Sequence, residues 1–349
     1  MTEIIVIKPC KAPSPTLINM IKAATLNKPY RIIEDFSCYL NLKNKKILFA
    51  LEINHSLWDV SMVCFMENLA LQGNNPLEGS IGAFLCHSSS ELGTKNFSQD
   101  MLFLASSLGC NFIGHCLVEA TNSLKNLLTW QKVLKIPLED ILYKKSSDLG
   151  NRLATFQPFC YENPKISVLY SSPHNVSNTL ELWYIIKGCL PPQLNIKEIL
   201  VENGAVLDCK GCPYDLCMHY GKRNGCFYGG VMVENILPAI EEADIIIWLC
   251  PNYNDAIAAN LTAVINRLTV LYNKISFYNK SMFGIIVSGN SGGDSVSKQL
   301  IGALNINKGF FLPSHGILTA TANDPLSIHK YHDIYNLAKD FSNSILKLC

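Results

Sequence analysis

Short apolar runs alternate with segments of helical periodicity through the second half of the chain. The runs are strand-sized and almost continuously hydrophobic, which is typical of a parallel sheet covered on both faces. The predicted strands are residues 166–170, 196–201, 245–250, 282–287 and 316–322. The predicted helices are residues 179–188, 232–242, 256–272, 295–304 and 331–348. This alternation predicts a doubly wound α/β fold, in which ligands bind at the carboxyl ends of the strands.

A weak internal repeat relates the first part of the chain to the second. A shift of 200 positions places Gly109, His115, Ala120 and Thr121 on Gly309, His315, Ala320 and Thr321. A shift of 198 places Asn54, Asn68 and Asn75 on Asn252, Asn266 and Asn273, and a shift of 163 places Ser14 and Thr16 on Ser177 and Thr179. The matches keep their order while the offset changes slowly, so we expect a tandem duplication with loop insertions.

The repeat predicts two domains of the same fold, residues 1–128 and 164–349, each with a parallel five-stranded sheet and helices on both faces. Residues 129–163 form the expected linker, which contains a helix. That helix is predicted over residues 130–142, with a new turn or a kink at Pro137 because proline interrupts a helix.

Composition and charge exclude several classes of protein. Hydrophobic residues make up 48% of the chain and charged residues 16%, which indicates a folded globular protein. The 29 Lys and Arg against 28 Asp and Glu leave a net charge of +1, so we expect no nucleic-acid or membrane partner. No apolar stretch approaches the ~20 residues of a membrane-spanning helix. The N-terminus lacks the basic start of a signal peptide, and we expect a cytoplasmic protein.

A polar loop, Ser171–Thr179, follows the first predicted strand of the second domain and leads into a helix. Free backbone N–H groups and the helix dipole favour an anion at such a place, and Ser and Thr hydroxyls can donate to phosphate oxygens. The alternative interpretation is ordinary helix capping by Ser177 or Asn178.

Two further loops follow strands at the same predicted edge, residues 251–255 and 288–294. The glycines of the second loop let backbone approach a flat ligand closely. The ring of Tyr253 can lie against the face of such a ligand. The alternative in each case is a plain turn.

Four of the 14 cysteines are clustered: Cys209, Cys212, Cys217 and Cys226. Four thiolates this close in sequence can ligate a [4Fe–4S] cluster or a structural zinc ion. The third alternative is that they hold no metal. The other ten are scattered, mostly among apolar residues, as reduced thiols are in a reducing compartment.

Taken in order, these features resemble the flavodoxin-like NAD(P)H-dependent FMN reductases, and more narrowly their iron–sulfur flavoprotein branch. The resemblance spans about residues 165–325. It rests on Ser177-Asn178-Thr179 at the end of the first loop, the cysteine cluster after the second strand, the Pro251-x-Tyr253 loop with Arg267 ending the next helix, and the pair Gly292-Gly293. The chain departs from the family at His174, where Arg is frequent, and at Asp255, where a small residue is common.

The resemblance implies FMN as the cofactor and assigns roles to the three loops. The phosphate is expected at Ser171, His174, Ser177, Asn178 and Thr179. The isoalloxazine ring is expected at Pro251, Asn252, Tyr253, Asn254, Asp255, Ser288, Gly289, Asn290, Gly292 and Gly293. For Cys209, Cys212, Cys217 and Cys226, the resemblance favours a [4Fe–4S] cluster over zinc.

The function expected from this resemblance is an FMN-dependent oxidoreductase or electron-transfer flavoprotein, with NAD(P)H or ferredoxin as electron donor. The chemistry resides in the flavin, so no catalytic side chain is predicted. The assembly is expected to be a homodimer or an intramolecular pseudo-dimer. The alternatives are a non-enzymatic redox carrier or sensor, and a flavin-free scaffold with a structural zinc ion.

The first domain is predicted to be a degenerate copy with a structural or partner role. Its first loop, Lys8–Thr16, carries three prolines, each of which removes an N–H that could face a phosphate. Ile53 and His55 stand at the positions of Pro251 and Tyr253, and Ser90-Glu91 replaces the glycine pair. The alternative is that this domain binds a different small ligand, with Lys11 and Lys95 as candidate contacts.

Overall fold

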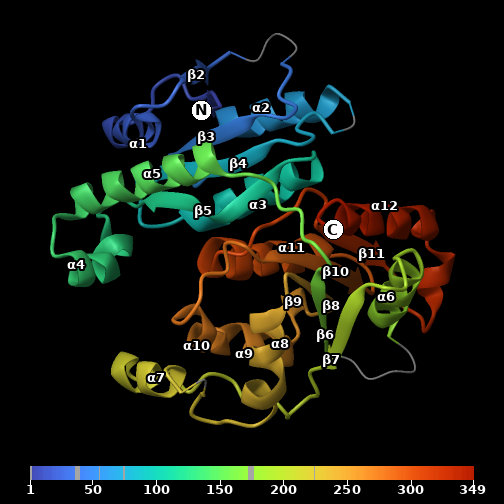
Figure 1. Cartoon of the computed structure of the whole chain (residues 1–349). Helices are drawn as coiled ribbons and strands as arrows, with labels where there is room; N and C mark the ends of the chain where they lie inside the picture. Colours follow the sequence, from blue (N-terminus) through green and yellow to red (C-terminus); the bar gives the residue numbers. More distant parts are fainter. Residues whose placement is uncertain (1, 36–39, 55, 74, 172–176, 224) are drawn as a thin grey trace. The chain divides into compact units, whose positions relative to one another are not determined.

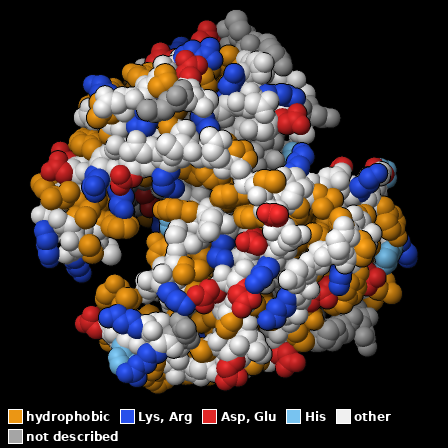
Figure 2. Space-filling view, in the orientation of Figure 1, with side chains coloured by type: hydrophobic (Ala, Val, Ile, Leu, Met, Phe, Trp, Pro, Cys, Tyr) orange, Lys and Arg blue, Asp and Glu red, His pale blue; other side chains and the backbone are white. Residues whose placement is uncertain are grey.

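The computed structural model describes residues 2–35, 40–54, 56–73, 75–171, 177–223 and 225–349. The chain divides into two compact units, Met1–Gln157 and Pro158–Cys349, and each unit folds around its own sheet (Figure 1). No helix within the described ranges combines the length and the hydrophobicity needed to cross a membrane. On the face shown in Figure 2, acidic and basic side chains are interspersed, in keeping with the net charge of +1.

The first unit contains a sheet of five parallel strands in the order β2-β1-β3-β4-β5. The strands are β1 (Ile4–Ile7), β2 (Tyr30–Ile33), β3 (Lys46–Ile53), β4 (Ile81–Ser88) and β5 (Asn111–Ala120). Every residue of β1 and β3 is buried, because these strands lie inside the sheet and helices cover both of its faces.

The helices of the first unit form two layers. They are α1 (Pro15–Thr25), α2 (Val60–Leu71), α3 (Thr94–Ser107), α4 (Leu128–Leu134) and α5 (Leu138–Thr155), with a short 3₁₀ turn η1 (Lys125–Leu127). Helices α1 and α5 pack together against β3 and β4, while α2 and α3 contact each other and α3 lies on β4 and β5. A side chain at Gly150 would collide with the Ala24 carbonyl, so glycine allows α5 to approach α1 closely.

The second unit contains five parallel strands in the order β7-β6-β8-β10-β11. They are β6 (Lys165–Tyr170), β7 (Asn195–Leu200), β8 (Ile245–Tyr253), β10 (Ser281–Ser288) and β11 (Ile317–Thr321). A sixth strand, β9 (Ala256–Ile257), pairs antiparallel with β8 and was not predicted. The turn between them places Asn254 and Asp255 at φ of 54° and 56°, the left-handed backbone of a tight hairpin.

Helices again cover the sheet of the second unit. They are α6 (Asn178–Gly188), α7 (Tyr214–Gly221), α8 (Leu237–Glu242), α9 (Ala259–Arg267), α10 (Thr269–Tyr272), α11 (Gly293–Ile301) and α12 (Ile334–Leu346), with π-helical turns η2 (Met232–Ile236) and η3 (Gly302–Ile306) and a 3₁₀ turn η4 (Ser327–Lys330). Helices α6 and α12 pack together, and α6 lies on β8 and β10. The helix predicted over residues 256–272 is in fact β9, α9 and α10.

Each unit therefore has the strand order of a flavodoxin-like domain. In this order the second strand is added on one side of the first strand, and all later strands are added on the other side. The predicted fold class is confirmed. In such a sheet the loops that follow the strands gather at the carboxyl edge, and the predicted site loops of the second unit follow β6, β8 and β10.

Candidate functional site

The loop after β6 leads to the N-terminus of α6. Ser177 is the N-cap of this helix, and its Oγ accepts a hydrogen bond of 3.3 Å from the Leu180 N–H. Ser171 is buried, and its hydroxyl has no hydrogen-bond partner among the residues that the structure describes. His174 lies outside the described residues. A buried hydroxyl without a partner at the start of this loop is a group that an anionic ligand can satisfy.

Asn178, the first residue of α6, fastens the helix to the segment after β11. Its Nδ2 donates to the carbonyls of Ala322 (3.2 Å) and Asp324 (2.9 Å), and its Oδ1 accepts from the Ile328 N–H (3.3 Å). The neighbouring Thr179 is buried. The Asn178 side chain thus positions the loop, while the first N–H groups of α6 are those that a helix leaves for an external acceptor.

Asn252 joins the loops that follow β8 and β10. Its Nδ2 lies 3.0 Å from Ser288 Oγ, 3.0 Å from the Ser291 carbonyl and 3.1 Å from Asp255 Oδ1. Ser288 is buried at the end of β10. Asn252 Oδ1 is buried without a partner among the described residues. The structure therefore brings together two of the three loops that the sequence assigned to one site.

Asp255 packs directly on Gly292. Gly292 is the N-cap of α11 and has φ of +84°, and a Cβ at this position would collide with Asp255 Oδ1. Only glycine combines this backbone with this contact. Placing the Asp255 carboxylate near the N-terminus of α11 is electrostatically favourable. The same carboxylate puts negative charge beside the glycine-pair loop.

The remaining predicted residues lie around these contacts. Pro251 and Tyr253 end β8, Asn254 is in the hairpin turn, Gly289 and Asn290 follow β10, and Gly293 begins α11. The Tyr253 side chain is 57% exposed, so its ring is open to a ligand. Neither Lys nor Arg occurs within residues 171–179, 251–255 or 288–294. These loops therefore offer backbone N–H groups, hydroxyls, asparagine amides and the His174 ring as donors, but no Lys or Arg.

Two side chains that sequence reasoning missed position the loops. Asn260 is buried, and its Nδ2 donates to the carbonyls of Val201 (2.5 Å) and Ser171 (3.3 Å). Gln299 of α11 accepts from the Ile257 N–H (3.3 Å) and donates to the Asp255 carbonyl (2.8 Å), which fastens the hairpin to α11. No local pattern marks either residue, because their partners are distant in sequence.

The four clustered cysteines line one cavity of about 280 Å³, together with Tyr220, Phe227 and Arg267 among others. Burial, followed by the neighbouring Cys209, Cys226 and Cys212, raises the pKa of the Cys217 thiol. Within the described residues, no three or more His, Cys, Asp or Glu side chains are arranged to hold a metal ion. The thiols share a cavity, but their arrangement does not fit a single metal ion.

Arg267 holds the cysteine segment at both of its ends. The side chain is 2% exposed, and its Nη atoms donate to the carbonyls of Leu207 (3.3 Å) and Gly229 (3.2 Å). Helix α7, which carries Cys217, lies within the segment that Arg267 encloses and was not predicted.

The second unit thus has the strand order and the edge loops of a flavodoxin-like, ligand-binding α/β domain. Residues 164–324 match the family model of NADPH-dependent FMN reductase, in agreement with the resemblance that the motifs of this unit showed. The match supports FMN as the cofactor and NAD(P)H as the electron donor. No curated protein matches the sequence.

Solved structures of similar proteins are distant. An azoreductase from Bacillus anthracis is 11% identical, with a TM-score of 0.38, and the match covers 52% of this chain and 98% of that one. An NAD(P)H:quinone oxidoreductase from Methanothermobacter marburgensis is 10% identical, with a TM-score of 0.37 and coverage of 52% and 96%. The Trp repressor binding protein from Bacillus subtilis is 16% identical, with a TM-score of 0.35 and coverage of 51% and 96%.

Proposed function

We propose that this chain is an FMN-dependent oxidoreductase that takes electrons from NAD(P)H. The observation that carries the proposal is the family match over residues 164–324, which spans the three loops at the carboxyl edge of the second sheet. Bound FMN supplies the hydride and electron transfer. The residues of the protein bind FMN and orient it for electron transfer from NAD(P)H.

We assign the phosphate end to the loop after β6. The N–H groups at the start of α6 that Ser177 does not cap donate to the phosphate oxygens. The buried Ser171 hydroxyl donates as well, since it has no hydrogen-bond partner among the described residues. Ser177 and Asn178 keep these donors in place through the cap and the tie to the segment after β11. Without Lys or Arg in this loop, we expect moderate affinity for the phosphate.

We assign the ring end to the hairpin after β8 and the loop after β10. The exposed Tyr253 ring covers one face of the flavin. The Asn252–Ser288 hydrogen bond sets the spacing of the two loops. Gly292 gives the second loop its left-handed backbone and leaves room for the Asp255 carboxylate beside the N-terminus of α11. The Asp255 carboxylate opposes negative charge on that edge.

For Cys209, Cys212, Cys217 and Cys226 we propose a [4Fe–4S] cluster, with zinc or free thiols as the alternatives; because the thiols are not arranged to hold a metal ion in this structure, a cluster or a zinc ion would require the segment to rearrange. The support is the shared cavity, because sulfur-only ligation from one short segment suits a cluster. Ferredoxin as an alternative donor depends on this part of the proposal.

We also infer that the two units arose by duplication. Both have the strand order 2-1-3-4-5 when their parallel strands are numbered along the chain. Gly109 and His115 have φ of 100° and 48°, and Gly309 and His315 have φ of 88° and 53°. A left-handed histidine is uncommon, so its recurrence six residues after a left-handed glycine supports common descent. A homodimer, or a pseudo-dimer within one chain, remains our proposal for the assembly.

The test is an anaerobic UV–visible spectrum of the purified chain after incubation with FMN, with iron, zinc and acid-labile sulfide assayed on the same sample. NADH and NADPH oxidation are then measured with and without FMN. Bound flavin with NAD(P)H oxidation supports the proposal. Bound flavin with no NAD(P)H oxidation favours a carrier instead of an enzyme, and the absence of flavin binding contradicts the proposal. About four irons and four sulfides per chain would establish the cluster.

A further inference from the structure

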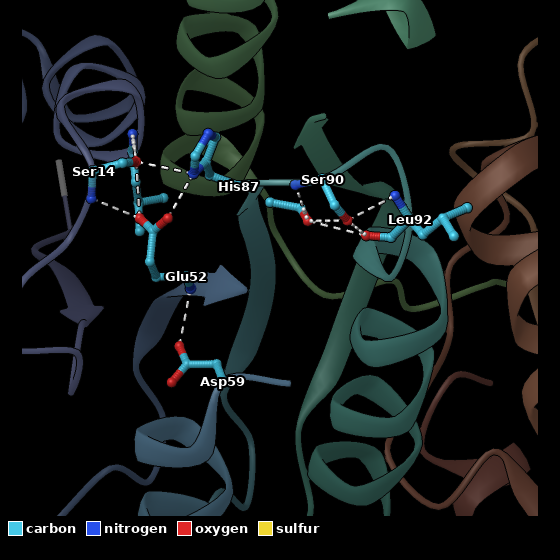
Figure 3. A network of polar contacts seen from close by, with 8 residues as sticks. Ser14, Glu52, Asp59, His87, Ser90 and Leu92 are labelled. Carbon is cyan, nitrogen blue, oxygen red and sulfur yellow. Dashed lines mark hydrogen bonds and ion pairs between the residues drawn. The ribbon is translucent and has the colours of Figure 1, made fainter. Parts of the chain in front are cut away.

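In the first unit, a carboxylate of the protein itself lies at the N-terminus of α1, the position that corresponds to the proposed phosphate site at α6. Glu52 Oε2 accepts hydrogen bonds from the Ser14 N–H (2.8 Å) and the Ser14 hydroxyl (2.9 Å), and Glu52 Oε1 lies 2.6 Å from His87 Nδ1 (Figure 3). Ser14 is the N-cap of α1, and Glu52 is 4% exposed. An internal anion therefore satisfies the donors that would otherwise face a phosphate. Charge repulsion from the buried Glu52 excludes a phosphate from this end of the unit.

The group Ser14, Glu52 and His87 is not a hydrolytic relay. Both Ser14 Oγ, at 3.0 Å, and Glu52 Oε1 contact the same ring nitrogen of His87, Nδ1. A serine nucleophile and its carboxylate use opposite nitrogens of the histidine. The Ser14 hydroxyl also donates to Glu52 and caps α1, so it is committed to holding the fold.

The carboxyl edge of the first sheet also carries a cavity, at the end away from α1. A cavity of about 570 Å³ lies at the carboxyl ends of β4 and β5, within the size range of small-molecule sites. Trp58 and Phe97 form an aromatic wall, with their rings edge to face at 5.7 Å, and Leu57 and Leu92 extend it. Trp58 is 50% exposed. The loop that carries Ser90 and Leu92 is visible in Figure 3, away from the Glu52 group.

This cavity lies between the counterparts of the ring-binding loops in the second unit. Gly93 is the N-cap of α3 with φ of +92°, as Gly292 is of α11 with φ of +84°. A Cβ at Gly93 would lie 3.3 Å from Leu57, where the one at Gly292 meets Asp255. Leu57 and Asp255 both have left-handed backbone, with φ of 63° and 56°. The first unit therefore keeps the contact between the two loops, but Leu57 replaces the charged Asp255 with an apolar side chain.

The charges that line the cavity are mostly negative. Glu91, Asp100 and Glu119 supply three carboxylates, and Lys95 supplies one ammonium group. Lys95 lies 3.7 Å from Glu119, which also accepts from the Thr94 hydroxyl at 2.6 Å. This arrangement disfavours anionic ligands and favours a cation that lies on the face of an aromatic ring of the wall.

We propose that this cavity binds a planar aromatic molecule that carries no phosphate and is neutral or cationic, stacked on Trp58. The face of the ligand ring stacks on the aromatic wall, and its edge lies along the loop that ends at Gly93. The carboxylates of the cavity repel molecules that carry the same ring together with a phosphate. All of the lining residues of this cavity belong to the first unit, whereas the proposed flavin site is built from residues of the second unit.

The experiment titrates the full chain with proflavine, a planar cationic dye, in the presence of excess FMN. Tryptophan quenching and the fluorescence of the dye are followed together. We expect saturable binding to one site that FMN does not displace. Trp58→Leu weakens this binding about tenfold, as expected for the loss of a cation–π contact. Trp130→Leu, which removes the other exposed tryptophan of the first unit, leaves it unchanged.

A second variant keeps the test valid if Trp58→Leu unfolds. Glu119→Gln should weaken proflavine binding about threefold to fivefold and reduce its dependence on salt. Glu67→Gln, on the exposed side of α2, is its matched control. Displacement of the dye by FMN, equal binding to Trp58→Leu and the wild type, or unsaturable binding would each overturn the proposal. FMN binding and NAD(P)H oxidation are measured separately, so this proposal can fail while the proposed oxidoreductase function stands.

Discussion

The amide of Asn252 lies 3.0 Å from the hydroxyl of Ser288, which joins the ends of two neighbouring strands of the second sheet. The same amide reaches the Ser291 carbonyl and the Asp255 carboxylate. One side chain therefore sets the distance between the hairpin after β8 and the loop after β10. If these loops hold the flavin ring, the affinity for FMN depends on this amide.

Asn252→Ala is therefore expected to weaken FMN binding about tenfold, because a hydrogen bond of this kind contributes about 1 kcal/mol and its loss frees both loops. The measurement is FMN fluorescence quenching. Asn343→Ala, at an exposed position of α12, is the control and should bind FMN as the wild type does. Unchanged FMN affinity in a folded Asn252→Ala variant would show that the ring does not lie between these loops.

Gly292→Ala tests the contact with Asp255. The added methyl group must adopt a left-handed backbone, which costs about 1–2 kcal/mol, and it also displaces the Asp255 carboxylate. Gly204→Ala is the matched control, because Gly204 has φ of +83° and open space around its Cβ position. We expect both variants to lose thermal stability and only Gly292→Ala to lose FMN binding. Equal FMN affinity in the two variants would argue against a ring at α11.

Glu52→Gln tests the internal anion of the first unit. The glutamine side chain cannot accept from Ser14 and His87 with both of its terminal atoms, so a buried donor is left without an acceptor. We expect the free energy of unfolding to fall by about 2–3 kcal/mol, measured by urea denaturation. Glu67→Gln should change it by less than about 0.5 kcal/mol. A loss this small in Glu52→Gln would contradict the role of Glu52 as the occupant of the α1 N-terminus.

Asp59 gives a pH-dependent prediction. Burial is the main cause that raises the pKa of this carboxyl above its usual 3.8, and the nearby Glu52 adds to the effect. A raised pKa means that the folded state holds the proton more tightly, so this contribution to stability is full below pH 3.8 and is lost as pH rises through the raised value. The difference in unfolding free energy between the wild type and Asp59→Asn should therefore shift against the wild type as pH rises through that window. A difference that does not change with pH would contradict the raised pKa.

Cys217→Ser tests the proposed cluster. If Cys209, Cys212, Cys217 and Cys226 hold a [4Fe–4S] cluster, the variant should lose most of its iron and acid-labile sulfide while keeping its affinity for FMN. Cys189→Ser, an exposed cysteine elsewhere in the second unit, should retain both. Equal iron content in the two variants would remove Cys217 from the ligand set.

The strands of the second unit were predictable because their apolar runs are continuous and helices separate them. Pro137 was predicted to divide a helix, and it lies between α4 and α5. Strand β9 was not predictable, since it depends on two left-handed residues, Asn254 and Asp255, inside a segment with helical periodicity. The tandem repeat and the domain boundaries at 128 and 164 stay predictions.

Side-chain hydrogen bonds between residues distant in the chain could not be predicted from the sequence either. Asn260 reaches Ser171, and Ser14 reaches Glu52, across 89 and 38 residues. Each partner is an ordinary polar residue in its own neighbourhood, and only the folded sheet brings the two together. The sequence therefore predicted which loops follow the strands, whereas the contacts that set the spacing of these loops required the structure; their role as a binding site stays a prediction.

The guanidinium of Arg267 has a consequence for how the cysteine segment meets its ligand. By donating to Leu207 on one side and Gly229 on the other, it closes the segment into a loop through contacts of the protein alone. The entropy of bringing four thiols to one cavity is thus lost during folding, not during ligation. If the segment holds the proposed cluster, a segment closed in this way would need a lower free concentration of its ligand than an open chain with the same cysteines.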